Sequence, residues 1–394
     1  MSTQDRWLLP EGIEEVLPQE ARQLESMRRR VLDMFETWGY ELVTPPMVEY
    51  LEALQTGVGS ELELQTFKVT DQLSGRMMGI RPDVTPQAAR IDAHYLKRDL
   101  PVRLCYIAPV LRARPDAFGG SREPLQLGAE LYGYSGTASD VESLCLMLST
   151  LDMVGIKNIH IDLGHVGVFR DLISDAGING EREQALFEAL QRKAQPEIVS
   201  MMELWGIASP QKEYLLALSG LNGDITVLDE ARKLFDKAPA GVKAAIDEIS
   251  AVADGVRRTR PDVPMYIDLA ELSGYSYYTG VVYSAFVPGH GRAIANGGRY
   301  DGIGEAFGRA RPATGFGADL RELIRLAPEH NMAVEGIFVV LDETDAEQQK
   351  MINALRAKGE RVVTQFSNAA GEAADFACDR ILSKQGKSWK VSNL

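Results

Sequence analysis

Residues 271–280 read Glu-Leu-Ser-Gly-Tyr-Ser-Tyr-Tyr-Thr-Gly, and residues 295–302 read Ala-Asn-Gly-Gly-Arg-Tyr-Asp-Gly. Between them, residues 281–287 have the β-branched and aromatic side chains of a strand, and residues 288–291 have the composition of a turn. Residues 292–295 would form the returning strand of a hairpin. Glycine lets a ligand approach the backbone closely, and tyrosine supplies a flat ring with a polar tip. This hairpin therefore predicts a cradle for a small polar ligand, although an ordinary sheet with glycine-rich turns fits the same residues.

The composition is that of a globular protein with more than one domain. The chain has 394 residues, of which 45% are hydrophobic and 25% are charged. It has neither an apolar run long enough to span a membrane nor the apolar core of a signal peptide, so we expect a cytoplasmic protein. Three distant cysteines and five scattered histidines argue against a disulfide framework and a metal site. The net charge of −14 argues weakly against a dominant nucleic-acid interface.

Hydrophobic periodicity predicts an α+β domain over residues 1–326, with mostly antiparallel strands. In a stretch of about 90 residues, 165–255, helical periodicity dominates and predicts a helical insertion. Period-two alternation places Gln126 and Glu130 on one face of their strand. The other expected elements are a helix from Pro18, a hairpin over 66–81, a helix from Thr85 with that side chain as its cap, strands over 102–107, 125–134, 158–163 and 265–269, and a helix over 140–154.

A second, smaller unit is expected over residues 330–394. Its apolar pattern predicts strands over 336–341 and 360–365, helices over 345–358 and 372–383, and a short strand over 388–391. This order is typical of a small α/β module.

Several short segments resemble, in their order along the chain, the class II aminoacyl-tRNA synthetases and among them histidyl-tRNA synthetase. Each segment is weak by itself, but together they cover roughly residues 5–326 and imply a class II antiparallel sheet with flanking helices that self-associates as a dimer. The segments are Gly79-Ile-Arg-Pro-Asp-Val-Thr85, Ala108-Pro-Val-Leu-Arg112, Leu125-Gln-Leu-Gly-Ala-Glu130, Tyr277-Tyr-Thr-Gly280, Gly297-Gly-Arg-Tyr-Asp301 and Thr314-Gly-Phe316.

Departures from that family imply that its chemistry is lost. The synthetase has Arg-Gly-Leu-Asp before the paired tyrosines, and Ser273 and Ser276 stand at the arginine and aspartate positions here. Its third motif ends in Glu-Arg, and Glu322 stands at that ATP-binding arginine position. Adenylyl transfer depends on cations that neutralise phosphate charge, so we expect no catalytic residue, cofactor or metal.

A synthetase-like chain of this kind resembles the regulatory subunits of ATP phosphoribosyltransferase, which acts in the first step of histidine biosynthesis. Residues 112–115, 273–280 and 319–323 carry this resemblance. It implies a non-catalytic subunit that binds histidine and mediates activation and feedback inhibition of a short-form catalytic subunit in a hetero-octamer. With a shortened C-terminal module, we expect no tRNA partner. The alternatives are an active histidyl-tRNA synthetase-like ligase and a scaffold that activates a partner without sensing histidine.

The resemblance also implies a histidine site. Asp83, Thr85, Gln126 and Glu130 would accept hydrogen bonds from the ammonium group of histidine. Tyr278 and Tyr300, with Glu130, would contact the imidazole, and Arg112 would bind the carboxylate. Structural explanations remain open. Asp83 and Thr85 would simply start a helix, and Gln126 and Glu130 would form a solvated strand face. Tyr300 would pack in the hairpin, and Arg112 would form a salt bridge. The expected site residues are Asp83, Thr85, Arg112, Gln126, Glu130, Tyr277, Tyr278 and Tyr300.

Overall fold

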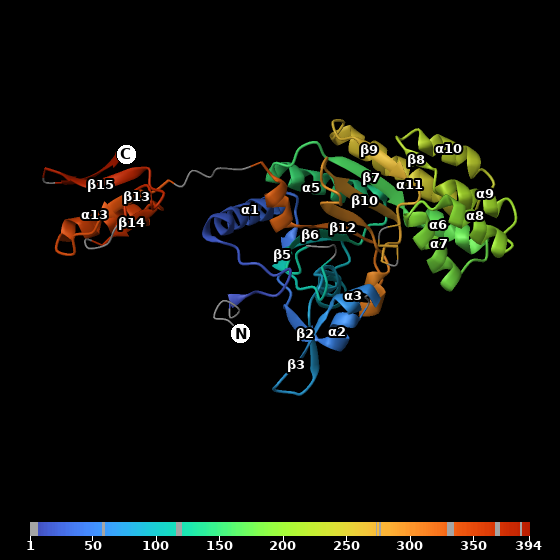
Figure 1. Ribbon diagram of the computed structural model, residues 1–394, viewed down its shortest axis with the longest axis horizontal. Coiled ribbons are helices and arrows are strands. Elements are labelled where there is room, and N and C mark those ends of the chain that lie inside the picture. The colour runs from blue at the N-terminus through green and yellow to red at the C-terminus, as the bar shows by residue number, and fades with distance from the viewer. Residues whose placement is uncertain are drawn as a thin grey trace. The chain divides into compact units, whose positions relative to one another are not determined.

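The chain forms two compact units, Met1–Pro328 and Glu329–Leu394, each of which is described by itself (Figure 1). The computed structural model describes residues 7–56, 60–115, 120–272, 274–275, 277–328, 335–366, 371–386 and 388–394. Ser273 and Ser276, on which the expected loss of synthetase chemistry partly rests, lie outside these described residues.

Among the described residues, the first unit is built on a nine-stranded sheet with the order β1-β5-β6-β12-β11-β10-β7-β9-β8. Neighbouring strands are antiparallel from β5 through to β7, whereas β1 with β5 and β7 with β9 are parallel. The mostly antiparallel α+β architecture is thus confirmed. The strands are β1 (Glu41–Leu42), β5 (Val102–Pro109), β6 (Leu125–Tyr132), β7 (His160–His165), β8 (Asn222–Gly223), β9 (Met265–Asp268), β10 (Val281–Phe286), β11 (Ala295–Arg299) and β12 (Ala313–Asp319).

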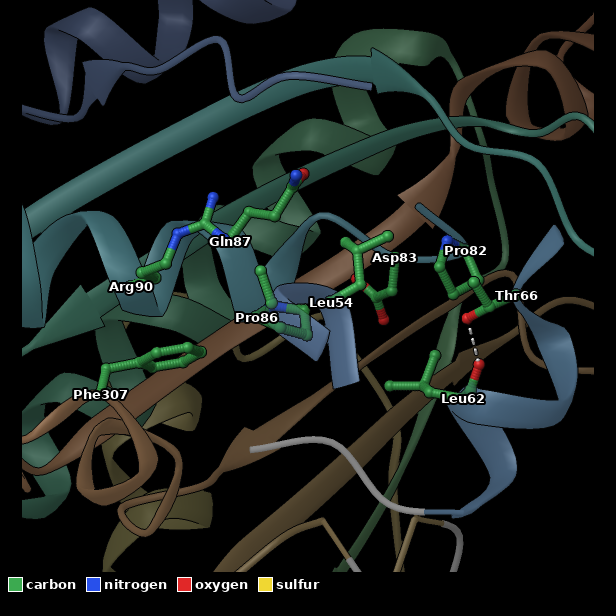
Figure 2. Close-up of a pocket in the computed structure, with 10 residues that line it drawn as sticks. Leu54, Leu62, Thr66, Pro82, Asp83, Pro86, Gln87, Arg90 and Phe307 are labelled. Carbon is green, nitrogen blue, oxygen red and sulfur yellow. Dashed lines mark hydrogen bonds between the residues drawn. The ribbon is translucent and has the colours of Figure 1, made fainter. Parts of the chain in front are cut away.

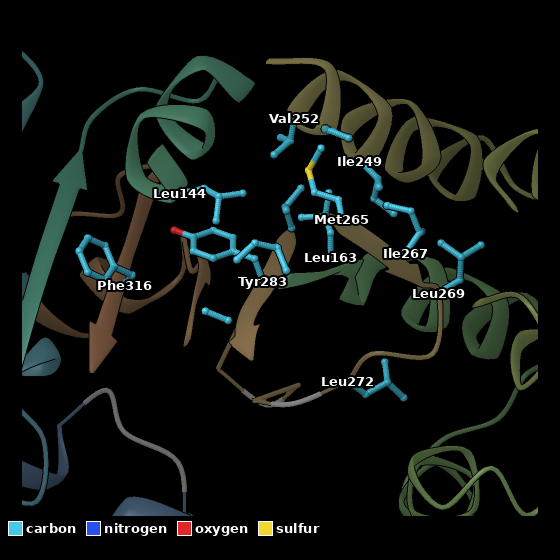
Figure 3. Packing of buried hydrophobic residues seen from close by; sticks show 14 of the residues in the cluster. Leu144, Leu163, Ile249, Val252, Met265, Ile267, Leu269, Leu272, Tyr283 and Phe316 are labelled. Carbon is cyan, nitrogen blue, oxygen red and sulfur yellow. The ribbon is translucent and has the colours of Figure 1, made fainter. Parts of the chain in front are cut away.

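A layer of three helices packs on this sheet: α1 (Pro18–Thr37), α5 (Thr137–Val154) and α11 (Ala240–Thr259). Their apolar stripes meet the strand side chains in one core. Figure 3 shows Leu144 of α5 and Val252 of α11 close to Tyr283 and Leu163 of the sheet. Each large apolar side chain buried in this way stabilises the fold by roughly 1.5–3 kcal/mol.

The stretch expected to be a helical insertion contains mainly helices, with the short strand β8 between the fourth and fifth, and it leads into α11. The helices are α6 (Val166–Asp175), α7 (Glu181–Gln191), α8 (Gln195–Leu204), α9 (Gln211–Leu218) and α10 (Val227–Leu234). None of the described helices combines the length and the apolar character that a bilayer crossing requires.

A small three-stranded sheet and several short helices form a further part of the first unit. The hairpin expected over residues 66–81 is present, because β3 and β4 pair in antiparallel fashion and β2 joins β4. The elements are β2 (Val48–Tyr50), α2 (Leu51–Gln55), α3 (Ser60–Gln65), β3 (Phe67–Thr70), β4 (Met77–Ile80), α4 (Thr85–Arg90) with a π-helical continuation (Ile91–Leu96), the 3-10 helix η3 (Ile303–Phe307) and α12 (Leu320–Leu326).

Two local expectations for this unit are wrong. The Thr85 side chain does not cap α4, whose N-cap residue is Val84; its hydroxyl instead lies 2.9 Å from the hydroxyl of Tyr106. The returning strand, expected over residues 292–295, is β11, which begins only at Ala295 and includes Gly297 and Gly298. A Cβ at Gly298 would lie 2.6 Å from the carbonyl oxygen of Val281, so the strand needs glycine there for close packing.

The second unit contains a four-stranded sheet with the order β14-β13-β15-β16 and the helix α13 (Ala346–Ala357). The helix expected over 372–383 is wrong: residues 380–385 form β15, which pairs with β16 along its length. Ile381 and Leu382 pack into different apolar clusters, as the alternation of a strand requires. The strands are β13 (Ile337–Val340), β14 (Val362–Gln365), β15 (Arg380–Gln385) and β16 (Ser388–Asn393).

Candidate functional site

A cavity of about 910 Å³ lies in the first unit, between the large sheet and the segment that carries the paired tyrosines. Its volume is within the range of small-molecule sites, roughly 300–1,000 Å³. Most of the expected site residues line it directly: Asp83, Thr85, Arg112, Gln126, Tyr277 and Tyr278. Glu130 and Tyr300 lie behind that wall, each with only 2% of its surface exposed. The contacts below join them to the lining residues.

The alternation of β6 explains why its polar residues reach this site. Leu127 and Ala129 point into the core beneath the helical layer, so Gln126 and Glu130 point to the other face. There Gln126 donates from Nε2 to Asp83 Oδ1 at 2.9 Å and accepts at Oε1 from the backbone N–H of Val84 at 2.9 Å. The solvated strand face that was left open for these residues is therefore excluded.

Asp83 is held in a fixed orientation with one oxygen left over. Its Oδ1 accepts from Gln126 and from the backbone N–H of Thr85, the latter at 2.8 Å. Within the described part of the chain, Oδ2 accepts no hydrogen bond. A carboxylate oxygen that faces a cavity in this way is suited to a cationic group such as an ammonium.

Glu130 is a buried carboxyl held by two tyrosines. Tyr106 donates to Oε1 at 2.9 Å, and Tyr300 donates to Oε2. Desolvation by burial raises the pKa of Glu130 from 4.5 to about 8, although both phenol hydrogen bonds act in the opposite direction. The neighbouring strand must leave room for this group: a Cβ at Gly315 would overlap the Glu130 carboxylate.

Aromatic rings close the site on the side of the 271–280 segment. Tyr277 stacks on Tyr300 with ring centroids 5.0 Å apart, and Tyr278 meets Tyr277 edge-on at 5.2 Å. Burial raises the pKa of each of these phenols well above 10, so they remain neutral. The Tyr277 hydroxyl is buried without a hydrogen-bond partner among the described groups. Leaving such a group unpaired costs about 1–3 kcal/mol, which a polar ligand would recover.

Another part of the cavity wall carries charges that satisfy one another. Arg292 donates to Glu322 Oε1 from Nε at 2.9 Å and from Nη2 at 2.6 Å. Nε2 of His290 lies 2.9 Å from the same oxygen. The Glu322 carboxylate is thus engaged in an internal ion pair.

Some site residues were not indicated by the sequence patterns. Tyr106 lies opposite Gly128 in the β5–β6 ladder, where a side chain at residue 128 would overlap the tyrosine ring. The sequence offered one signal for Tyr106, which is a tyrosine in an otherwise apolar strand. That Gly128 lies opposite it becomes known only when the pairing register of the two strands is known. Tyr132, whose hydroxyl lies 3.4 Å from that of Tyr300, and Arg170, which lines the cavity from α6, gave no local signal.

A second, much smaller pocket lies on the other side of Asp83 (Figure 2). Its volume is about 10 Å³, which is at most enough for a water molecule. Figure 2 shows Pro86 and Arg90 of α4 facing Leu54 of α2 and Phe307 of η3 around it. This packing positions the loop that carries Asp83. No cluster of acidic, histidine or cysteine side chains suited to a metal ion occurs among the residues that the structure describes.

Comparison with known proteins identifies the family. Residues 12–323 match the sequence model of the family described as Histidyl-tRNA synthetase, and residues 334–392 match that of the ATP phosphoribosyltransferase subunit HisZ C-terminal domain. The ATP phosphoribosyltransferase regulatory subunit of Thioalkalivibrio sulfidiphilus is 53% identical over 100% of both chains. The chain belongs to the ATP phosphoribosyltransferase regulatory subunit family.

Further relatives agree with this assignment. The ATP phosphoribosyltransferase regulatory subunit of Nitrosococcus oceani is 49% identical over 99% of this chain and 98% of that one. A crystal structure of an ATP phosphoribosyltransferase regulatory subunit/histidyl-tRNA synthetase from Bacillus halodurans has a TM-score of 0.84 at 28% identity, covering 97% of this chain and 99% of that one. Histidyl-tRNA synthetase from Nostoc sp. shares the fold, with a TM-score of 0.79 at 22% identity, covering 96% and 91%.

The predicted family, the class II synthetase-like fold and the non-catalytic role are therefore confirmed. The chain is a regulatory subunit of ATP phosphoribosyltransferase.

Proposed function

We propose that this regulatory subunit binds free histidine in the cavity and conveys the occupancy of the site to the catalytic subunit as activation and feedback inhibition. The observation that carries the proposal is the buried carboxyl of Glu130 beside the unpartnered hydroxyl of Tyr277. Histidine combines a small polar ring with an ammonium and a carboxylate, and the cavity offers a complementary group for each.

The ring would occupy the tyrosine-lined end. An imidazole in its neutral form has one donor and one acceptor nitrogen. The Tyr277 hydroxyl can donate to the acceptor, and Glu130 can accept from the donor once Tyr106 or Tyr300 turns away or shares its oxygen. The rings of Tyr277 and Tyr278 supply the apolar walls that such a ring requires.

The ammonium group would lie against the start of α4. Asp83 Oδ2 is available for a charge-assisted hydrogen bond to this group. Thr85, two residues further along the chain, also lines the cavity. Gln126 would then act mainly by holding Asp83 in place. Arg112 also lines the cavity and is one candidate for the carboxylate.

The wider assembly is part of the same proposal. We place the chain in a self-associated dimer that joins short-form catalytic subunits in a hetero-octamer, without tRNA, in the cytoplasm. The three cysteines are buried and free of disulfides, which suits a reducing compartment. The short catalytic partner would lack a regulatory domain of its own, so the histidine response would come from this chain.

The test is the activity of the reconstituted complex with and without histidine, together with calorimetric titration of histidine. We expect the unaltered complex to bind and respond, and the double variant Glu130→Ala, Tyr300→Phe to lose both properties. Tyr214→Phe is the matched control, since Tyr214 is a buried tyrosine packed on Phe235 in the helical insertion.

Other outcomes select the alternative functions. Activation of the catalytic subunit with no response to histidine would select a scaffold that does not sense the amino acid. Histidine-dependent exchange of pyrophosphate into ATP by this chain would select an active ligase and overturn the proposal.

A further inference from the structure

Three arginines are among the described residues that line the cavity, and they differ in their partners. Arg292 is neutralised by Glu322, as described above. Arg112 Nε lies 3.5 Å from the carbonyl oxygen of Pro82, and this side chain has further interactions. Arg170 forms no ion pair with any carboxylate in the described part of the chain. The cavity therefore contains a cation that is held by carbonyl oxygens rather than by a carboxylate.

The orientation of Arg170 is nevertheless fixed. It lies in α6, half-buried, and its Nη2 donates to the carbonyl oxygen of Tyr278 at 3.1 Å and to that of Tyr275 at 3.5 Å. Its guanidinium carbon lies 5.3 Å from the centre of the Tyr275 ring. A guanidinium has five N–H donors. Nη1 and Nε make no hydrogen bond to a carbonyl or carboxylate oxygen of the described residues, and the guanidinium also interacts with the Tyr275 side chain. Donors on one edge of the fork can therefore still bind a ligand.

The surroundings of Arg170 hold this arrangement rigidly. The Tyr275 hydroxyl donates to Glu183 of α7 at 2.8 Å, and its ring packs at 5.3 Å from Phe169 and 5.6 Å from Phe187. Because the carbonyls that orient Arg170 belong to this anchored segment, little side-chain entropy remains to be lost when a ligand binds.

We propose that Arg170 binds the α-carboxylate of the amino acid in this cavity and determines that the site requires a free carboxylate. The inference rests on the proposed binding of histidine. The 271–280 segment brings no lysine or arginine to the cavity, so the cation must come from another element. The planar fork of an arginine matches a carboxylate, whereas Asp83 provides the negative charge for the ammonium. Arg170 lies beside Tyr278, which places it at the tyrosine wall of the same cavity.

The test is a thermodynamic cycle between ligand and residue. Histidine and histidinol, in which a hydroxymethyl group replaces the carboxylate, are titrated into the complex with the catalytic subunit. The regulatory chain is unaltered or carries Arg170→Gln or Arg112→Gln. We expect Arg170→Gln to weaken histidine binding roughly 10- to 100-fold and to leave histidinol binding nearly unchanged. Arg112→Gln should not produce this selective loss.

Two results would overturn the assignment while leaving the proposed function intact: an equal loss for both ligands in Arg170→Gln, or the selective loss in Arg112→Gln alone. A failure of the unaltered complex to bind histidine would overturn both. Thermal melting checks that each variant is folded. If Arg170→Gln has a lowered melting temperature, the same cycle is measured on Arg170→Lys, because lysine keeps the positive charge but lacks the planar fork. We then expect a smaller loss of affinity that is still selective for histidine over histidinol.

Discussion

Replacing Glu130 with glutamine should flatten the pH dependence of the stability of this subunit. In the folded chain, burial raises the pKa of this carboxyl from 4.5 to about 8. A carboxyl with a raised pKa binds a proton more tightly in the folded state than in the unfolded state. Its contribution to stability is therefore complete below about pH 4.5 and is lost as the pH rises through about pH 8.

The size of the effect follows from the same values. The rise corresponds to at most about 5 kcal/mol, of which about 3 kcal/mol lies between about pH 5.5 and about pH 8.5. In Glu130→Gln the buried group is neutral at every pH and keeps one oxygen that can accept from Tyr106. The free energy of unfolding of the variant should thus change less over this interval, by an amount approaching that figure.

Urea denaturation of the ligand-free chain at both pH values measures this difference. Glu142→Gln is the matched control, because Glu142 also lies near a tyrosine hydroxyl, 3.3 Å from that of Tyr40, but pairs with Arg103 at the edge of the core. The reasoning is refuted if Glu130→Gln and the unaltered chain lose stability in parallel, or if the control flattens the profile equally.

Three further predictions concern the site. Tyr277→Phe removes a buried hydroxyl that has no hydrogen-bond partner among the described groups, so the melting temperature of the ligand-free chain should not fall, while histidine binding should weaken about 10-fold. Thermal melting and calorimetry measure these two effects, and a large loss of stability would contradict the account. Gly315→Ala places a methyl group against the Glu130 carboxylate and should destabilise the chain by about 1–3 kcal/mol and impair binding, whereas in Gly317→Ala the nearest atom lies 3.5 Å away and the melting temperature should hardly change. A chain that ends at Pro328 contains every proposed site residue and should still bind histidine in calorimetry; loss of binding would show that the second unit contributes.

The sequence predicted the parts of this structure that depend on local patterns. The alternation in residues 125–134 placed Gln126 and Glu130 on one face, and the dominant helical periodicity of residues 165–255 predicted helices there, as the structure has them. The pattern over 372–383 misled, because Ile381 and Leu382 pack on opposite sides of a strand and only the pairing with β16 reveals this. A short apolar run without its neighbours fits either kind of element.

The contacts that shape the site depend instead on register and on distant segments. Tyr106 reaches Glu130 because Gly128 lies directly opposite it in the ladder, which the separate strands do not show. Arg170 bonds to the carbonyl of a residue 108 positions away. The sequence analysis assigned Arg112 to the carboxylate and did not indicate Arg170, because that arginine comes from the first helix of the insertion.

The distribution of paired and unpaired groups differs between two parts of the cavity wall, and this difference supports the proposed binding of an amino acid. Around Glu322 the charges are already satisfied, because Arg292 and His290 both contact its carboxylate, so Arg292 is not free to neutralise a polyphosphate. Around Glu130 the opposite holds: Asp83 keeps a free oxygen and Tyr277 a free hydroxyl within the described structure. Polar groups that are buried or held at a cavity without partners favour whatever ligand completes them. The free energy available for binding is therefore concentrated where an amino acid would lie, as a regulatory subunit requires.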